Sequence, residues 1–187
     1  MNNFQKMISR NHYILILIAL FPLWCHAQVI IPLPDSKFDA KKYRIKDTVT
    51  IVENTFLFTE DGDDIDGNLI IWMVKTNKSH SDTIRIFSIT LHFYDGFETD
   101  YSAVASEYDV IGDKFILYSH SISTFYTLET STVTKSHTQK ETFVIQKHGK
   151  VVRLDRRYGM VNEKVLDKEL DNKIRARTDH YFPYGRD

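Results

Sequence analysis

The sequence predicts a mainly β fold, an antiparallel meander that is barrel-like or a two-layer sandwich, with one C-terminal α-helix. Three observations predict it. Runs rich in β-branched and aromatic residues alternate with period two, turn residues separate these runs, and a helical period appears only after Tyr158-Gly159. An open sheet with the helix across one face is the alternative. No repeat of fixed length occurs, so a solenoid or propeller is not expected.

The N-terminal segment has the three parts of a secretory signal. Lys6 and Arg10 precede an apolar run from Ile14 to Phe21, and small residues follow near Ala27. The run is shorter than the ~20 residues that a membrane-spanning helix needs. We therefore expect residues 1–27 to be a signal peptide cleaved after Ala27, which leaves a mature chain of 160 of the 187 residues, without a transmembrane segment.

Cys25 is the only cysteine, so the mature chain is expected to contain none and to form no disulfide. An acylated lipoprotein cysteine is the alternative use of Cys25, but the bulky Trp24 stands where that processing prefers a small residue. The mature chain keeps 22 basic and 25 acidic residues, a formal net charge of −3. Because no basic stripe stands out, we expect no nucleic-acid partner.

The first elements after the signal follow from proline content and period. Residues 28–46, which contain two prolines, are expected to be an extended lead-in, and 47–187 a single β-rich domain. Strands are expected from Thr48 onward. Leu69 to Lys75 is apolar on both faces, which is typical of a central strand covered from two sides. Thr83 to Tyr94 alternates cleanly and predicts one amphipathic strand.

Turn residues divide the next region into hairpins. Gly112-Asp113 predicts a tight reversal, and His148-Gly149 predicts a two-residue hairpin turn. The letters "HTQKE", residues 137–141, predict a further turn. The strands expected around these turns are Tyr101 to Ile111, Lys114 to His120, Thr124 to Lys135 and Thr142 to Lys147.

The helix is expected at about 162–177, with Asn162 as its N-cap. Its apolar stripe would consist of Val165 or Leu166 together with Leu170 and Ile174, packed on the sheet. Two charged pairs, Glu169 with Lys173 and Asp171 with Arg175, have the i,i+4 spacing that supports a helix.

An acidic stretch, Asp61 to Asp66, raises the possibility of calcium binding. A helical-hand loop needs oxygen ligands at positions 1, 3 and 5, glycine at 6 and glutamate at 12, and no register supplies them. We interpret the stretch as an acidic β-connection whose Asp and Gly residues serve turn geometry. An irregular calcium site is the alternative.

Candidate chemical groups are scattered. His92 and His120 fall on expected strands and could meet across a sheet, but no histidine pair has the spacing of a metal motif. The carboxylate pairs are Asp95 with Glu98 and Glu107 with Asp109, which could be imagined as the acid and base of a glycosidase. No nucleophile elbow or phosphate loop occurs. We assign no catalytic, cofactor-binding or metal-binding residue.

Tyrosines are the remaining recognition-type residues. Five lie on or beside expected strands, namely Tyr94, Tyr101, Tyr108, Tyr118 and Tyr126, and tyrosine is favoured at binding surfaces. The leading hypothesis is a small non-enzymatic binding or accessory module of the bacterial cell envelope, periplasmic or secreted, with an unknown protein or envelope ligand as partner. A periplasmic or secreted hydrolase with a site assembled from distant residues, or a calcium-binding exported protein, is the alternative.

Overall fold

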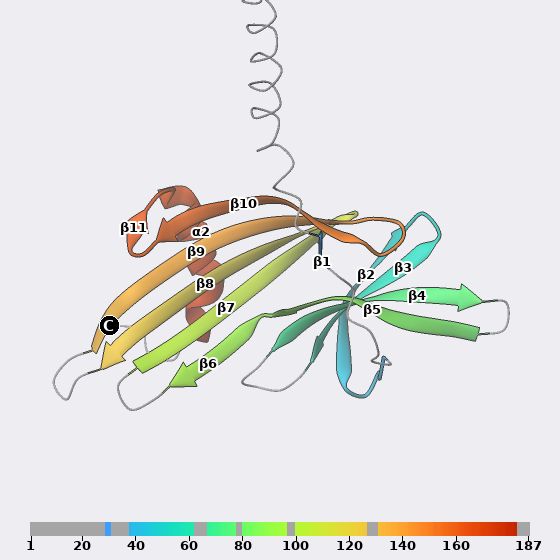
Figure 1. The fold of residues 1–187 in the computed structure, drawn as a ribbon, viewed down its shortest axis with the longest axis horizontal. Coiled ribbons are helices and arrows are strands. Elements are labelled where there is room, and N and C mark those ends of the chain that lie inside the picture. The colour runs from blue at the N-terminus through green and yellow to red at the C-terminus, as the bar shows by residue number, and fades with distance from the viewer. Residues whose placement is uncertain are drawn as a thin grey trace, which may run out of the picture.

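The computed structural model describes residues 29–30, 38–61, 67–77, 80–96, 100–126 and 131–182. It confirms the predicted mainly β class, with two antiparallel sheets and one C-terminal helix (Figure 1). The predicted signal segment and most of the acidic stretch, Gly62 to Asp66, lie outside the described residues. Within the described part of the chain, no helix is long and apolar enough to cross a membrane.

The strands fall into two sheets. The large sheet has the order β1-β10-β9-β8-β7-β6, with β11 paired to β10, and the small sheet has the order β2-β3-β4-β5. The elements are β1 (Val29–Ile30), β2 (Tyr43–Ile51), β3 (Asn54–Asp61), β4 (Asn68–Asn77), β5 (His80–Thr90), β6 (His92–Gly96), β7 (Asp100–Ile111), β8 (Lys114–Tyr126), β9 (Ser131–Ile145), β10 (Val151–Val161), β11 (Lys164–Val165), α2 (Lys168–Thr178) and the 3-10 helix η2 (Asp179–Tyr181).

The core lies between the two sheets. Its buried members come from β3, β4, β5, β8, β9 and β10 and include stacked and edge-on phenylalanine rings, such as Phe115 against Phe143 at 4.7 Å. Helix α2 covers the opposite face of the large sheet, where Leu170 and Ile174 pack on Tyr118. The small sheet therefore covers one face of the large sheet and the helix covers the other.

Strand β4 is the central strand that the sequence predicts. Leu69 and Ile71 face the core between the sheets, whereas Ile70 and Trp72 face the other side of the small sheet. The indole N–H of Trp72 donates to Thr59 at 3.1 Å, so the one polar atom of this ring is satisfied.

Several predicted boundaries before the helix are wrong. The expected strand Thr124 to Lys135 is divided between β8 and β9. Strand β2 begins at Tyr43, inside the expected lead-in 28–46, because its charged outer residues hide the period that marks a strand. The expected strand Thr83 to Tyr94 is broken at Leu91, so that β5 and β6 belong to different sheets. The expected turn at 137–141 is continuous strand within β9. Thr138 and Glu141 are buried there, and they have polar partners on α2 and β10, respectively.

The hairpins are confirmed at their positions. Ile111 pairs with Lys114 across Gly112-Asp113, and Gly112 has a φ of +59°. At the second hairpin Ile145 pairs with Val151, so the connection is longer than the expected two residues. Gly149 has a φ of +84°, which the turn requires.

The helix starts later than predicted. Asn162 is not its cap but lies in the β10–β11 turn with a φ of +47°. Asp167 is the N-cap and accepts a hydrogen bond from the Leu170 N–H at 3.0 Å. Leu170 and Ile174 form the expected buried stripe, but Val165 and Leu166, about half exposed, do not belong to it.

Candidate functional site

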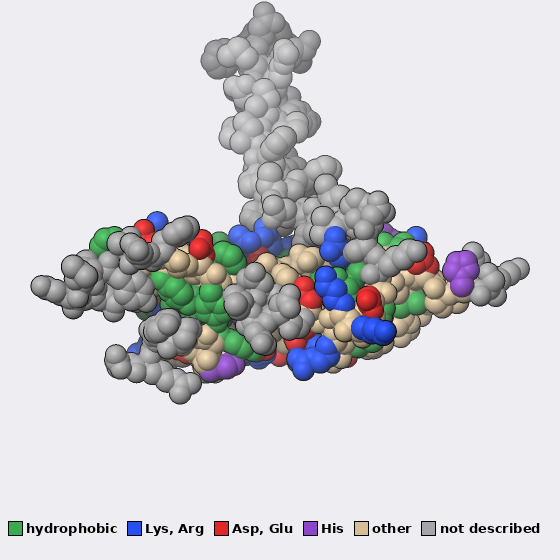
Figure 2. Space-filling view, turned by 90° about the horizontal axis from the view of Figure 1, so that it is seen from below, with side chains coloured by type: hydrophobic (Ala, Val, Ile, Leu, Met, Phe, Trp, Pro, Cys, Tyr) green, Lys and Arg blue, Asp and Glu red, His purple; other side chains and the backbone are tan. Residues whose placement is uncertain are grey.

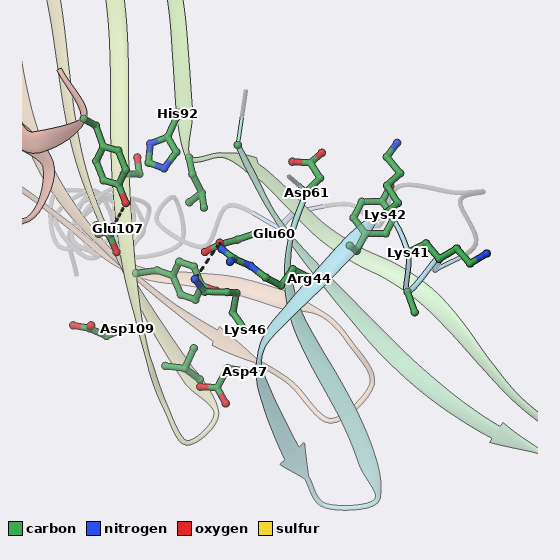
Figure 3. Close-up of a pocket in the computed structure, with 18 of the residues that line it drawn as sticks. Lys41, Lys42, Arg44, Lys46, Asp47, Glu60, Asp61, His92, Glu107 and Asp109 are labelled. Atoms are coloured by element: carbon green, nitrogen blue, oxygen red, sulfur yellow. Dashed lines mark hydrogen bonds and ion pairs between the residues drawn. The ribbon is translucent and has the colours of Figure 1, made fainter. Parts of the chain in front are cut away.

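A cleft with a volume of about 1030 Å³ opens between the two sheets. One wall is β2 with the turn before it and the end of β3, and the other is the second half of β7 with Tyr181 (Figure 3). We call it the inter-sheet cleft. Its lining residues are Ala40 to Arg44, Lys46, Asp47, Glu60, Asp61, Gly67, Leu91, His92, Tyr94, Ser106 to Val110 and Tyr181.

The cleft exists because the chain turns away from the large sheet at Leu91. The N–H groups of Leu91 and His92 both donate to the carbonyl of Gly67, at 2.7 and 3.2 Å. The last residue pair between β6 and β7 is His92 with Ala105. Beyond Ala105, no strand among the described residues pairs with the outer edge of β7, and this edge faces β2 across the cleft.

Carboxylates on the β2 and β3 wall have nearby partners. Glu60 accepts from Arg44 at 3.2 Å and lies 3.3 Å from the Lys46 ammonium. Asp61 accepts from the backbone N–H of Asn68 at 2.8 Å and from its amide at 3.2 Å. The negative charges of this wall therefore organise the ends of β2, β3 and β4.

Carboxylates on the β7 wall are engaged by the C-terminal elements. Asp109 accepts two hydrogen bonds from Arg177 of α2, at 2.7 and 3.0 Å, and Glu107 accepts from the Tyr181 hydroxyl. The Arg177 guanidinium lies 4.4 Å from the Tyr118 ring centre. Asp47, the remaining carboxylate of the lining, accepts from the Thr48 N–H at 2.7 Å. The other four carboxylates are engaged by side chains or by Asn68, which does not favour catalysis by a free acid and base pair.

Two polar atoms of the cleft differ from these groups. His92 Nδ1 and the Tyr108 hydroxyl are buried and have no hydrogen-bond partner among the described residues. Burial lowers the pKa of His92, against the opposing effect of the nearby Glu107 and Glu60 carboxylates. Burial also raises the pKa of the Tyr108 phenol, and Glu60 adds to this effect. Unsatisfied buried groups are rare and call for an explanation.

Aromatic rings support the His92 end of the cleft. The His92 ring lies 4.0 Å from the Tyr181 ring, and the Tyr94 hydroxyl donates to the Tyr181 carbonyl at 2.5 Å. Tyr108 stacks at 6.1 Å on Phe58 of the core. This end of the cleft is held by three elements, β6, β7 and η2.

The tyrosines that the sequence marks divide between several places. Tyr94 and Tyr108 line the cleft, Tyr101 lies 6.4 Å from Tyr94, and Tyr118 is buried under α2; Tyr126 ends β8. Tyr181 also lines the cleft but lies in the C-terminal tail, whose sequence shows no helical or strand period. Only its aromatic character could have pointed to it.

Candidate metal residues do not gather. His92 and His120 flank Ala105 in one cross-strand row, which puts a strand between them, about 10 Å apart. Among the described residues no group of three or more His, Cys, Asp or Glu could hold a metal ion. Of the carboxylate pairs, Glu107 and Asp109 lie in the cleft wall, whereas Glu98 is outside the described residues.

A second polar cluster resembles a Ser-His-Asp arrangement. His120 Nε2 lies 3.2 Å from Ser136 Oγ, and His120 Nδ1 lies 3.0 Å from Asp179 Oδ1. Ser136 is 4% exposed and also accepts from Arg175 at 3.1 Å, so its hydroxyl is enclosed by neighbouring side chains. Burial, and secondly Arg175, lowers the pKa of His120. This cluster attaches α2 and η2 to the large sheet.

The large sheet also has an open hollow on the face not covered by α2, with a volume of about 610 Å³. Beside it, Glu141 is buried and accepts from Arg153 at 2.9 Å and from Arg156 at 2.6 and 2.8 Å. On the face shown in Figure 2, basic and acidic side chains are interspersed.

Comparison with protein-family models, curated proteins and solved structures gives no match.

Proposed function

We propose that this chain is a non-enzymatic binding module of the cell envelope that takes its ligand in the inter-sheet cleft. The observation that carries the proposal is the division of polar groups there. Glu60, Asp61, Glu107 and Asp109 are held by Arg, Lys, Asn and Tyr partners, and Asp47 accepts from the Thr48 N–H, whereas His92 Nδ1, the Tyr108 hydroxyl and the outer edge of β7 after Ser106 have no partner among the described residues. Such groups suit a ligand that supplies hydrogen bonds.

Export is part of the same proposal. The support is the basic, apolar and small-residue order of residues 1–27. Intact-mass measurement of the protein recovered from the periplasm or medium of a bacterial host tests it, with loss of the first 27 residues as the expected result. Full-length protein retained in the cytosol would contradict export.

Binding is tested with the mature chain on three probes: a library of random linear peptides, a glycan array, and a panel of chromogenic glycoside and ester substrates. The expected result is a peptide or glycan whose affinity falls about fivefold in Tyr108→Phe, the change for one lost hydrogen bond of about 1 kcal/mol. Tyr158→Phe is the matched control, since Tyr158 lies at the other hollow. Turnover of a chromogenic substrate that Glu107→Gln abolishes would replace the proposal with an enzymatic function.

A further inference from the structure

Strand β7 extends beyond the strand beside it. It runs from Asp100 to Ile111, and β6 pairs with it only as far as Ala105. The next residue, Ser106, is buried, and residues 107–111 present an outer edge about 17 Å long. On its inner side the same segment is fully paired with β8, so it is a rigid strand with one open edge.

The register identifies which backbone groups face the cleft. Ile111 and Lys114 close a two-residue turn and are therefore a hydrogen-bonded pair, and in an antiparallel ladder such pairs recur at every second residue. Ser106, Tyr108 and Val110 lie between these pairs and direct their N–H and C=O groups away from β8. Ser106 is 2% exposed and directly follows the last β6–β7 pair, so its backbone is covered; for Tyr108 and Val110 no backbone partner on this side occurs in the part of the chain that the structure describes.

The opposite wall leaves room for one more strand. Strand β2 is the outer strand of the small sheet, and its residues line the cleft from Tyr43 to Asp47 apart from Ile45. Exposed strand edges are usually protected by lysine, proline or a covering segment, and residues 106–111 contain neither lysine nor proline. A volume of about 1030 Å³ between the walls is of the size that a short extended segment needs.

We propose that the ligand is an extended segment of a partner protein, which adds to the open edge of β7 as a further strand. This rests on the proposed binding function of the cleft. Main-chain hydrogen bonds to Tyr108 and Val110 supply the attachment, as in other cases of strand addition. Side chains on alternate faces of the added strand supply the selection.

The two faces of β7 define the side-chain pattern of that segment. On one face Tyr108 and Val110 pack against the core between the sheets, so an added strand meets apolar neighbours there. On the other face Glu107 and Asp109 are bonded to Tyr181 and Arg177, but each carboxylate can accept further hydrogen bonds, and the Asp109 side chain is 39% exposed. The segment therefore carries apolar residues at every second position and basic or hydroxyl residues between them.

Backbone methylation tests the pairing directly. Peptides selected on the mature chain are resynthesised with a single N-methyl group at each amide in turn. Strand addition predicts that affinity falls about tenfold or more at every second amide and little at the others, because only alternate N–H groups face β7. Glutamate in place of the basic residues is expected to weaken binding as well.

Protein variants give an independent measurement. Val110→Pro removes one N–H that faces the cleft while leaving the bonds to β8 intact, and it is expected to abolish peptide binding. Ser81→Pro is the matched control, since Ser81 lies on β5, an outer strand of the small sheet whose residues do not line the inter-sheet cleft. If Val110→Pro unfolds the chain, the methylation pattern decides alone.

The outcomes separate the two proposals. A methylation profile without a two-residue period, or a glycan as the ligand, would overturn strand addition and leave the binding function standing. A dimer of the mature chain that Val110→Pro dissociates would identify a second copy as the occupant and likewise overturn a foreign segment. Turnover of a chromogenic substrate, as described above, would remove the binding function itself.

Discussion

At Gly159 strand β10 and helix α2 approach each other closely, and replacement of this glycine by alanine is expected to destabilise the protein strongly. A Cβ atom there would lie 2.6 Å from Asp171 N, 2.7 Å from Asp171 Cα and 2.7 Å from Thr138 Oγ1. Ordinary contacts are 3.4–4 Å, so backbone must move by about 1 Å. The Gly159 carbonyl also accepts from the N–H groups of Leu166 and Asp167, so the strand cannot move without disturbing the start of the helix.

Two structural responses to the added methyl group set limits on the loss of stability in Gly159→Ala. Overpacking with the helix still attached costs about 1–3 kcal/mol. Detachment of the helix would expose Leu170 and Ile174, at about 1.5–3 kcal/mol each. The chain takes the less costly response, so we expect the free energy of unfolding to fall by about 2–3 kcal/mol and Tm to fall by about 4–12 °C.

Urea and thermal denaturation of Gly159→Ala measure the effect. Gly96→Ala is the matched control, because a Cβ at Gly96 meets only one side-chain atom, Tyr101 Cδ2, at 3.4 Å. A change below about 1 kcal/mol is expected for the control. A urea midpoint of Gly159→Ala equal to that of the unmodified chain would refute the close packing of β10 on α2.

Three further predictions concern single polar groups. Glu141→Gln is expected to lower the free energy of unfolding by about 1–3 kcal/mol, because Arg153 and Arg156 lose their charged partner. Glu53→Gln, in an exposed turn, is the control and should leave the free energy of unfolding nearly unchanged; urea titration measures both variants. His120 faces Arg175, Asp179 and Asp171, and its pKa in the folded chain is lowered from 6.5. Because the unfolded chain then binds the His120 proton more readily, the free energy of unfolding is expected to fall as pH decreases below about 6.5. Melting curves of His120→Gln across this pH range should show a weaker fall. Tyr108→Phe removes a buried hydroxyl that has no hydrogen-bond partner among the described residues. The free energy of unfolding, measured by thermal denaturation, should stay unchanged or rise by up to about 1 kcal/mol. A clear loss of stability would show that this hydroxyl makes a hydrogen bond in the folded chain.

Local pattern predicts those parts of the fold that local physics decides. The apolar run Leu69 to Lys75 indicates a strand buried on both faces, and the glycine at 112 marks a turn that requires a positive φ. The helix start fails because Asn162 and Asp167 are both residues that cap helices, and only the short pairing of β11 with β10 decides between them. The polar run 137–141 reads as a turn because its buried members are satisfied by arginines and by a helix distant in sequence.

The cleft could not have been predicted in the same way, because it depends on where pairing stops. Residues Phe87 to Phe93 alternate without interruption, yet the Gly67 carbonyl accepts from Leu91 and His92 and redirects the chain there. If the chain continued straight, β5 would extend β6 along β7 and pair with residues 106–111. The turn at Leu91 instead sends β5 into the small sheet, where Phe87 enters the core. One bend thus both places the small sheet over the large one and leaves the end of β7 unpaired, so the binding edge is a direct consequence of how the core is assembled.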